Sequence, residues 1–306
     1  MSPPSATAPA QAINPDTTVG TVRLTVTDLD RSRAFYEHAV GLRALELADG
    51  TLALGTGGGR PLVALRGDPA APVPGPRATG LYHLAILVPT RRDLAAAVTR
   101  LVRGGGPLHG ASDHLVSEAV YLSDPDGNGI EIYRDRPRER WPRAGDALQM
   151  ATLPLDLRGL LAELSDPDTP ERLAPTGTRI GHVHLQVAEL HETEEFYRGV
   201  LGFEVMVRSY PGALFVAAGG YHHHIGLNTW HSAGASPPPP GSVGLRSFEI
   251  ELPDEHELVA LLERVQAAGI EIERTESGAL VRDPSGNGII LGMRLPGHAR
   301  SAPTAR

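Results

Sequence analysis

Two histidines and one glutamate, His83, His182 and Glu131, stand in segments of this 306-residue sequence where apolar and other residues alternate. Successive side chains of a β-strand point to opposite faces, so the apolar neighbours take one face and the His or Glu takes the other. Two imidazoles and a carboxylate that converge with open coordination positions are the ligand set of non-haem Fe(II) oxygenases. The three residues are therefore a candidate Fe(II) site, with Mn(II) as the alternative metal.

Further histidines lie near these positions. The same alternation predicts that His184 faces the same way as His182. In the triple histidine 222–224, the apolar residues Ile225 and Leu227 that follow define the buried face and predict that His222 and His224 lie on the polar one. Each residue also has a plain interpretation: a strand histidine is more often hydrogen-bonded than a ligand, and a lone glutamate is more often solvated. It is their combination that indicates a site.

Composition narrows the classes of function. The formal net charge is −8 and no dense Lys/Arg stripe occurs, so we expect no nucleic-acid partner. The absence of cysteine leaves only nitrogen and oxygen ligands for a metal. We also expect no membrane partner, because no run approaches the roughly 20 apolar residues that span a bilayer. We expect a cytoplasmic protein that acts on a small molecule, either as a monomer or as a homo-oligomer.

Two motifs occur twice and define the architecture. Residues 30–42 resemble 192–203, and the motif at 124–132, Asp-Pro-Asp-Gly-Asn-Gly-Ile-Glu-Ile, resembles that at 283–291. Strand-like segments followed by helical spacing recur four times. The predicted strands are 22–26, 83–88, 182–187 and 248–252, and the predicted helices are 31–40, 93–102, 192–201 and 255–268. The pattern predicts an α+β fold of four βαβββ modules.

The four modules group into two sequence halves. We predict an N-terminal domain at 16–144, a proline-containing linker at 145–178 and a C-terminal domain at 179–296. Each domain would hold two modules, as cupped mixed sheets with helices outside.

The chain resembles the vicinal-oxygen-chelate superfamily and, within it, type I extradiol catechol 2,3-dioxygenases. The superfamily places a ligand at the start of a module's first strand and a Glu after an Asp-Pro-x-Gly turn. The extradiol signature is matched by His114, then Tyr121 after an apolar residue, the turn 124–127 and Glu131. Ser112 is the one mismatch. The resemblance extends from about residue 18 to 294.

The resemblance also implies roles for individual residues. The two histidines and the glutamate of the first paragraph would hold Fe(II), and a catechol-like or hydroquinone-like diol would be cleaved with dioxygen. His224 would be the acid/base histidine, Tyr121 would hydrogen-bond a substrate oxygen, and His114 would be a nearby proton donor. His184 and Trp230 are expected to line the pocket.

The sequence departs from the family in where the ligands lie. In the well-known two-domain members the metal is in the C-terminal half, but here Ile290 replaces the Glu and Ser247 replaces the first-strand ligand of module four. Thr21 takes that position in module one. Modules two and three are therefore predicted to pair around one site, with modules one and four as a ligand-free counterpart.

Two alternatives remain on the same fold. A glyoxalase-type isomerase or thiol-transfer enzyme would use Ni(II), Zn(II) or Mn(II), with His224 as a fourth ligand beside the other three. A non-catalytic protein that binds an aromatic compound is the other alternative. Because fold alone does not select a function, the site must decide among them.

Overall fold

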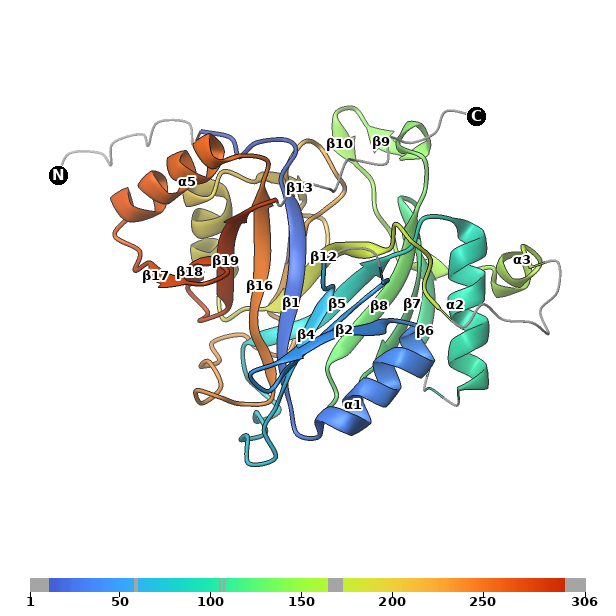
Figure 1. Cartoon of the computed structure of the whole chain (residues 1–306). Coiled ribbons are helices and arrows are strands. Elements are labelled where there is room, and N and C mark those ends of the chain that lie inside the picture. The colour runs from blue at the N-terminus through green and yellow to red at the C-terminus, as the bar shows by residue number, and fades with distance from the viewer. Residues whose placement is uncertain (1–10, 58–59, 105, 107, 165–172, 295–306) are drawn as a thin grey trace.

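The computed structural model describes residues 11–57, 60–104, 106, 108–164 and 173–294. These residues form an α+β fold on two large sheets (Figure 1). Four βαβββ modules supply most of the strands, and the predicted fold class is confirmed. Residues 165–172 of the predicted linker and the end of the predicted C-terminal domain, 295–296, lie outside the described residues.

Eight strands from modules two and three, with β11 of the connecting segment, form one nine-stranded sheet, which we call the site sheet. In spatial order they are β11 (Leu153–Pro154), β6 (Gly110–Asp113), β7 (Ser117–Ser123), β8 (Gly129–Asp135), β5 (Gly80–Leu87), β12 (Arg179–Gln186), β15 (Ile225–Asn228), β14 (Ala213–Ala217) and β13 (Glu204–Val207). At its centre β5 and β12 run antiparallel, so a strand from each sequence half meets there. The predicted pairing of modules two and three is confirmed.

Eight strands from modules four and one form the other sheet, which we call the counterpart sheet. In spatial order they are β17 (Glu273–Thr275), β18 (Gly278–Arg282), β19 (Gly288–Met293), β16 (Gly244–Leu252), β1 (Thr18–Val26), β4 (Val63–Gly67), β3 (Thr51–Gly55) and β2 (Arg43–Ala48). Here β16 and β1 are the antiparallel central pair. A small separate hairpin joins β9 (Arg143–Ala144) to β10 (Ala147–Leu148).

Helices connect the first and second strands of each module. They are α1 (Leu29–Phe35) with the π-helical turn η1 (Tyr36–Val40), α2 (Arg91–Arg103), α4 (Leu190–Glu194) with the π-helical turn η3 (Glu195–Val200), and α5 (Glu255–Ala267); α3 (Leu157–Leu161) and the short η2 (Arg138–Arg140) lie outside the modules. Polar side chains cap their first turns. Thr90, for example, accepts the backbone N–H of Asp93, whose carboxylate accepts the N–H of Thr90, a capping box.

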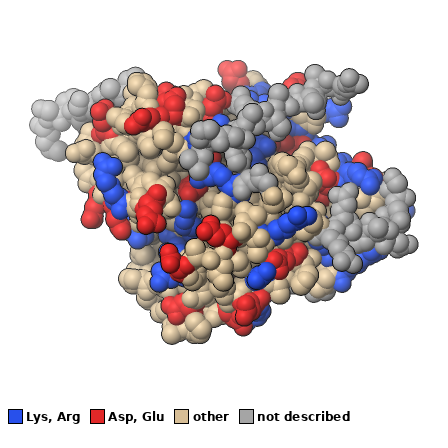
Figure 2. Space-filling model, in the orientation of Figure 1, with Lys and Arg blue, Asp and Glu red and all other residues tan. Residues whose placement is uncertain are grey.

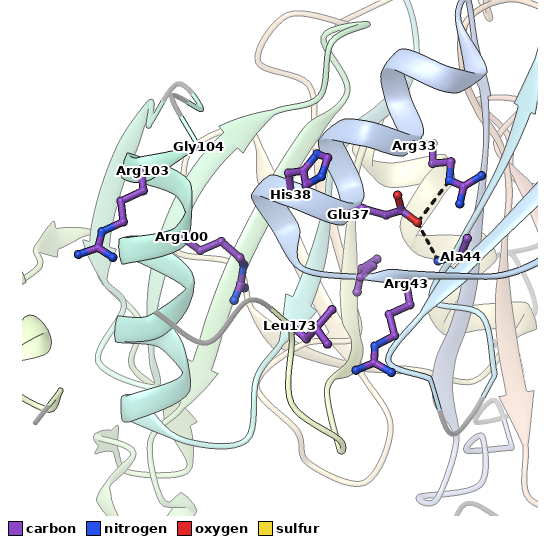
Figure 3. Close-up of a pocket in the computed structure, with 10 residues that line it drawn as sticks. Arg33, Glu37, His38, Arg43, Ala44, Arg100, Arg103, Gly104 and Leu173 are labelled. Carbon is purple, nitrogen blue, oxygen red and sulfur yellow. Dashed lines mark hydrogen bonds and ion pairs between the residues drawn. The ribbon is translucent and has the colours of Figure 1, made fainter. Parts of the chain in front are cut away.

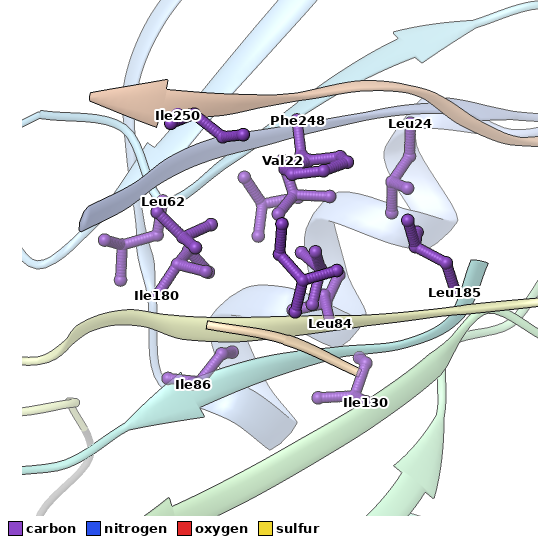
Figure 4. Packing of buried hydrophobic residues seen from close by; sticks show 14 of the residues in the cluster. Val22, Leu24, Leu62, Leu84, Ile86, Ile130, Ile180, Leu185, Phe248 and Ile250 are labelled. Carbon is purple, nitrogen blue, oxygen red and sulfur yellow. The ribbon is translucent and has the colours of Figure 1, made fainter. Parts of the chain in front are cut away.

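The central strands of the two sheets pack directly against each other. Figure 4 shows Val22 and Phe248 of the counterpart sheet facing Leu84 and Leu185 of the site sheet. The sequence predicted only that helices lie outside the sheets. At the centre the partner is the other sheet, because its apolar face excludes water equally well. The opposite face of the site sheet is thereby left for polar side chains.

The repeated motifs meet in space as a structural device. Tyr36 of η1 donates its hydroxyl hydrogen to Asp124 in the turn before β8, and Tyr197 of η3 does the same to Asp283 before β19. Each aspartate also accepts two backbone N–H groups of its own turn, as Asp124 does from Asp126 and Asn128. Burial raises the pKa of Asp124, so these hydrogen bonds offset a cost of desolvation. These hydrogen bonds link module one to module two and module three to module four.

An arginine of α2 binds the carbonyl groups at the end of η1. Arg100 of α2 is buried and donates to the carbonyl oxygens of Ala39 and Val40, as Figure 3 places it between α2 and η1. Arg264 of α5 makes the equivalent bonds to the end of η3. The cavity beside Arg100, about 540 Å³, is lined by none of the predicted site residues.

The surface carries charges of both signs. On the face in Figure 2, the basic and acidic side chains of the described residues are interspersed rather than gathered into a stripe. Among the described helices, none combines the length and apolar character needed to cross a membrane.

Candidate metal centre

His182, Ala85 and Glu131 lie side by side on three neighbouring strands of the site sheet. In the register, His182 of β12 pairs with Ala85 of β5, and Ala85 pairs with Glu131 of β8. Because the side chain of Ala85 is only a methyl group, the two longer side chains can meet above β5. His83 lies two positions before Ala85 and therefore on the same face of that strand.

The three predicted ligands converge. One ligand atom from each of His83, Glu131 and His182 lies within 4.8 Å of the other two. Oε2 of Glu131 is 3.0 Å from Nε2 of His83 and 3.4 Å from Nε2 of His182. All three residues are buried. The sheet thus brings together residues about 100 positions apart in the chain.

The imidazole nitrogens make no hydrogen bonds to the described residues. Nε2 of His83 and both ring nitrogens of His182 are buried without a hydrogen-bond partner, although the two Nε2 atoms lie close to the carboxylate of Glu131. Buried polar atoms without partners are costly and rare in folded proteins. One ligand atom from each of His83, Glu131 and His182 is close to the other two, and such a set fits a bound divalent metal.

Burial also sets the charges. It lowers the pKa of His182 to about 4, so this imidazole is neutral at pH 7 and has a lone pair to offer. Burial alone would raise the pKa of Glu131, but the neighbouring His182 and His83 lower it well below its ordinary value. The centre therefore presents the neutral imidazole of His182 and the carboxylate of Glu131 beside the imidazole of His83.

Tyr121 and His114 lie next to this centre. Tyr121 of β7 pairs with Glu131, and its ring centroid is 5.8 Å from that of His83. His114 Nδ1 lies 2.8 Å from the carbonyl oxygen of Ala151, which can only accept, so Nδ1 carries the proton. His114 Nε2 then accepts the hydroxyl hydrogen of Tyr121, at 2.6 Å. In this arrangement His114 donates to Ala151 and orients the hydroxyl of Tyr121 by accepting from it; its role as a proton donor to substrate stays a prediction.

The residues of the triple histidine differ in their contacts. The ring of His223 lies against that of His182, with centroids 4.0 Å apart, whereas His222 turns toward Asp135. His224 Nδ1 accepts the backbone N–H of Ala218. Strand alternation was extended from Ile225 back to these residues, but β15 begins at Ile225 and the histidines precede it. The prediction that His222 and His224 share the polar face therefore concerns residues outside the strand and stays a prediction.

A hydrogen-bonded chain runs from His223 through His222 to Asp135, whose side chain is partly exposed. His223 Nδ1 is 2.8 Å from His222 Nδ1, and His222 Nε2 is 2.9 Å from Asp135. The hydroxyl of Tyr221 also donates to Asp135 and lies 2.8 Å from that of Tyr133. His223 was missed because a residue in a loop has no periodic signal, although three adjacent histidines marked the segment.

The counterpart sheet lacks this centre. At the positions of the ligands it carries Thr21, Ser247 and Ile290, as the sequence indicated. Glu249 pairs with Ile290 in parallel register, the same relationship that Ala85 has with Glu131. A carboxylate thus stands where the site sheet has a methyl group.

The carboxylate of Glu249 is already engaged. It accepts from Arg23 at 2.7 Å, from Arg60 at 3.0 Å and from the backbone N–H of Thr21 at 3.0 Å. Two guanidinium groups thus bind this carboxylate through charge-assisted hydrogen bonds. The residues of this sheet therefore form an ion-pair network rather than a set of converging ligands.

Comparisons with known proteins agree with this architecture. The family model described as Glyoxalase/Bleomycin resistance protein/Dioxygenase superfamily matches residues 18–132 and 179–291. Catechol-2,3-dioxygenase of Bacillus subtilis (strain 168) is 46% identical over 277 residues, which cover 89% of this chain and 96% of that protein.

Solved structures share the fold. A protein of Bacillus subtilis subsp. subtilis str. 168 superposes with a TM-score of 0.63 at 16% identity, covering 94% of this chain and 87% of its own. Glyoxalase I from Zea mays gives a TM-score of 0.55 at 18% identity, covering 90% and 92%. The chain belongs to the glyoxalase/bleomycin resistance protein/dioxygenase superfamily and is an enzyme related to catechol-2,3-dioxygenase.

Proposed function

We propose that this enzyme is an Fe(II)-dependent extradiol dioxygenase that cleaves the ring of a catechol-like or hydroquinone-like aromatic diol, in the aromatic catabolism of the cytoplasm. The convergence of His83, His182 and Glu131, with unpartnered imidazole nitrogens, carries the proposal. A set of two imidazoles and one carboxylate suits Fe(II), with Mn(II) as the alternative. The relationship to a catechol-2,3-dioxygenase supports the substrate class.

Fe(II) held by two neutral imidazoles and one carboxylate would supply a centre of net positive charge that lowers the pKa of a bound phenol and keeps coordination positions open. The burial of the three side chains limits the access of water to this centre. The protein's remaining task is to place the diol and to accept its protons.

His223 is the acid/base group of the proposal. The carboxylate of Asp135 can only accept, so Nε2 of His222 carries its proton and Nδ1 of His222 is left with a lone pair. Nδ1 of His223 must then donate to it, and Nε2 of His223 keeps a lone pair that can take a proton from a substrate hydroxyl. The role that the family resemblance implies for His224 stays a prediction, but its Nδ1 is already engaged with Ala218.

Tyr121 holds a substrate oxygen. Its hydroxyl hydrogen is donated to His114. The lone pairs of the hydroxyl oxygen are then available to accept a hydrogen bond from the substrate. Burial, followed by the negative charge of Glu131, raises the pKa of Tyr121 well above its usual value. Tyr121 therefore stays neutral and accepts a hydrogen bond from a diol that has not yet lost its proton.

A glyoxalase-type isomerase or thiol-transfer enzyme is the second candidate. The observation that favours it is the contact of His223 with His182, which places a third imidazole beside the ligand set. Four-residue ligation would suit Ni(II), Zn(II) or Mn(II), and the reaction would consume no oxygen.

Reconstitution separates the two candidates. The metal-free enzyme is loaded anaerobically with Fe(II), Mn(II), Ni(II) or Zn(II), and oxygen uptake is followed with catechols and hydroquinones. The proposal expects uptake with Fe(II), and no metal-dependent uptake in His83→Ala or His182→Ala. Full occupancy by Fe(II) without oxygen uptake on any diol, together with isomerase activity in the Ni(II) or Zn(II) enzyme, would replace it with the second candidate.

A further inference from the structure

Three aromatic side chains extend from the candidate metal centre to the surface. His184 contacts the ligand His83, with ring centroids 4.9 Å apart, and Tyr82 contacts His184 at 5.1 Å. Trp230 contacts both Tyr82 and His184, at 5.4 and 5.5 Å. We call Tyr82, His184 and Trp230 the aromatic ledge.

A β-bulge turns Tyr82 toward this ledge. His184 pairs with His83, but the next residue, Leu185, pairs with Leu81, so Tyr82 has no partner on β12. Strict alternation would have placed Tyr82 on the core face with Leu84. The extra residue instead puts Tyr82 and His83 on the same side, and bulges of this kind redirect side chains beside functional sites.

The ledge is held in place by hydrogen bonds. The indole N–H of Trp230 donates to the carbonyl oxygen of Pro211 at 2.9 Å, and its backbone N–H donates to Asn228. The amide of Asn228 also donates to Nε2 of His184, at 3.0 Å. Gly212 stands under the indole, where an added Cβ would come within 3.2 Å of Trp230. These contacts hold the rings of Trp230 and His184 in a defined orientation.

Neighbouring exposed apolar side chains that form one patch often mark a binding site for a ligand or a partner. Trp230 is 42% exposed and Tyr82 is 36% exposed, whereas the second tryptophan, Trp141, is 7% exposed. The ring contacts from Trp230 through His184 to His83 are continuous, so the ledge connects the candidate metal centre to exposed surface. Edge-to-face and offset-stacked contacts with such rings favour planar aromatic groups.

We propose that the aromatic ledge binds a planar apolar substituent of the substrate, so that the preferred diol carries a second ring or comparable planar group. The inference rests on the proposed function for the diol end of the ligand, but the ledge acts by binding alone. It therefore predicts an affinity difference that needs neither dioxygen nor turnover.

Anaerobic calorimetry on the Fe(II) enzyme tests the proposal, with catechol and 4-phenylcatechol as probes. Wild-type enzyme should bind 4-phenylcatechol more tightly than catechol. Trp230→Ala should weaken 4-phenylcatechol binding about tenfold, equal to about 1.4 kcal/mol, and change catechol binding less than about twofold. Trp230→Phe should restore part of the difference. Leu47→Ala removes an exposed apolar side chain of the counterpart sheet and should change neither affinity.

Fluorescence locates the substituent. In a Trp141→Phe background, Trp230 is the remaining tryptophan, and 4-phenylcatechol should alter its emission more than catechol does. Equal affinity of the wild-type enzyme for both probes, or an equal loss for both in Trp230→Ala, would overturn the ledge proposal. Failure of ring cleavage with the affinity difference intact would overturn the proposed function and leave the ledge.

Discussion

The imidazole of His223 lies against that of His182, with ring centroids 4.0 Å apart, whereas the ring contact of His224 is with Tyr221 at 4.9 Å. This relationship changes which histidine we expect to move protons. A base must come within hydrogen-bond reach of the proton it takes, and of these two histidines His223 is the one whose ring lies against a candidate ligand.

Replacement of His223 should therefore separate catalysis from metal binding. His223→Phe should keep its iron and bind catechol but lose about 10²–10⁴-fold in kcat, the usual contribution of an acid/base group. His224→Phe is the matched variant and should lose far less. Iron content and kcat of both variants are measured together. Loss of turnover only in His224→Phe would restore the role implied by the family resemblance, and loss of iron in His223→Phe would make His223 a ligand.

Asp135 should act through His222 on the orientation of His223. In Asp135→Asn the amide can donate to Nε2 of His222, which favours the opposite tautomer and removes the acceptor for His223 Nδ1. Outer hydrogen-bond partners typically contribute about 10–100-fold to activity, so kcat should fall by that factor with little change in KM. Asp146→Asn, an exposed replacement, is the control. An unchanged kcat and pH profile in Asp135→Asn would show that the chain does not position His223.

Glu131 is the only carboxylate of the candidate ligand set, so Glu131→Ala should abolish tight Fe(II) binding and turnover while the fold persists. Ser247→Ala, at the position in the counterpart sheet that corresponds to a ligand, should leave the iron content unchanged. Iron per chain and circular dichroism are the measurements. Near wild-type iron in Glu131→Ala would remove this residue from the site.

Stability of the metal-free enzyme should depend on pH through His224. Burial lowers its pKa to about 3, below the value of 6.5 expected when unfolded. As pH falls from about 6.5 toward 3, the unfolded state binds a proton that the folded state does not, and the free energy of unfolding decreases. At most about 1.4 kcal/mol per pH unit comes from one such group.

The variant His224→Asn tests this dependence. Asn offers an oxygen to the N–H of Ala218 but does not titrate, so the decrease between pH 6.5 and 4 should be shallower than in the wild type. Chemical denaturation at several pH values measures the slope. Equal slopes in the two proteins would contradict the assignment, since the remaining histidines are common to both.

Local patterns in the sequence were enough for the modules and for the ligand candidates. The repeats predicted four βαβββ units, and alternation around His83, Glu131 and His182 predicted one polar face for each strand. Both inferences hold because the period of a strand and the caps of a helix are local properties. The domain limits at 16–144 and 179–296 stay predictions.

The sequence by itself determined which residues could be ligands and which modules lacked them. Tertiary structure decided the rest: the methyl group of Ala85 that lets His182 reach Glu131, the bulge that turns Tyr82, and the approach of His223. These depend on strand register and on loops, where a shift of one residue reverses the face of a side chain. The alternation along a single strand does not show its register, because the register is set by pairing with the neighbouring strand.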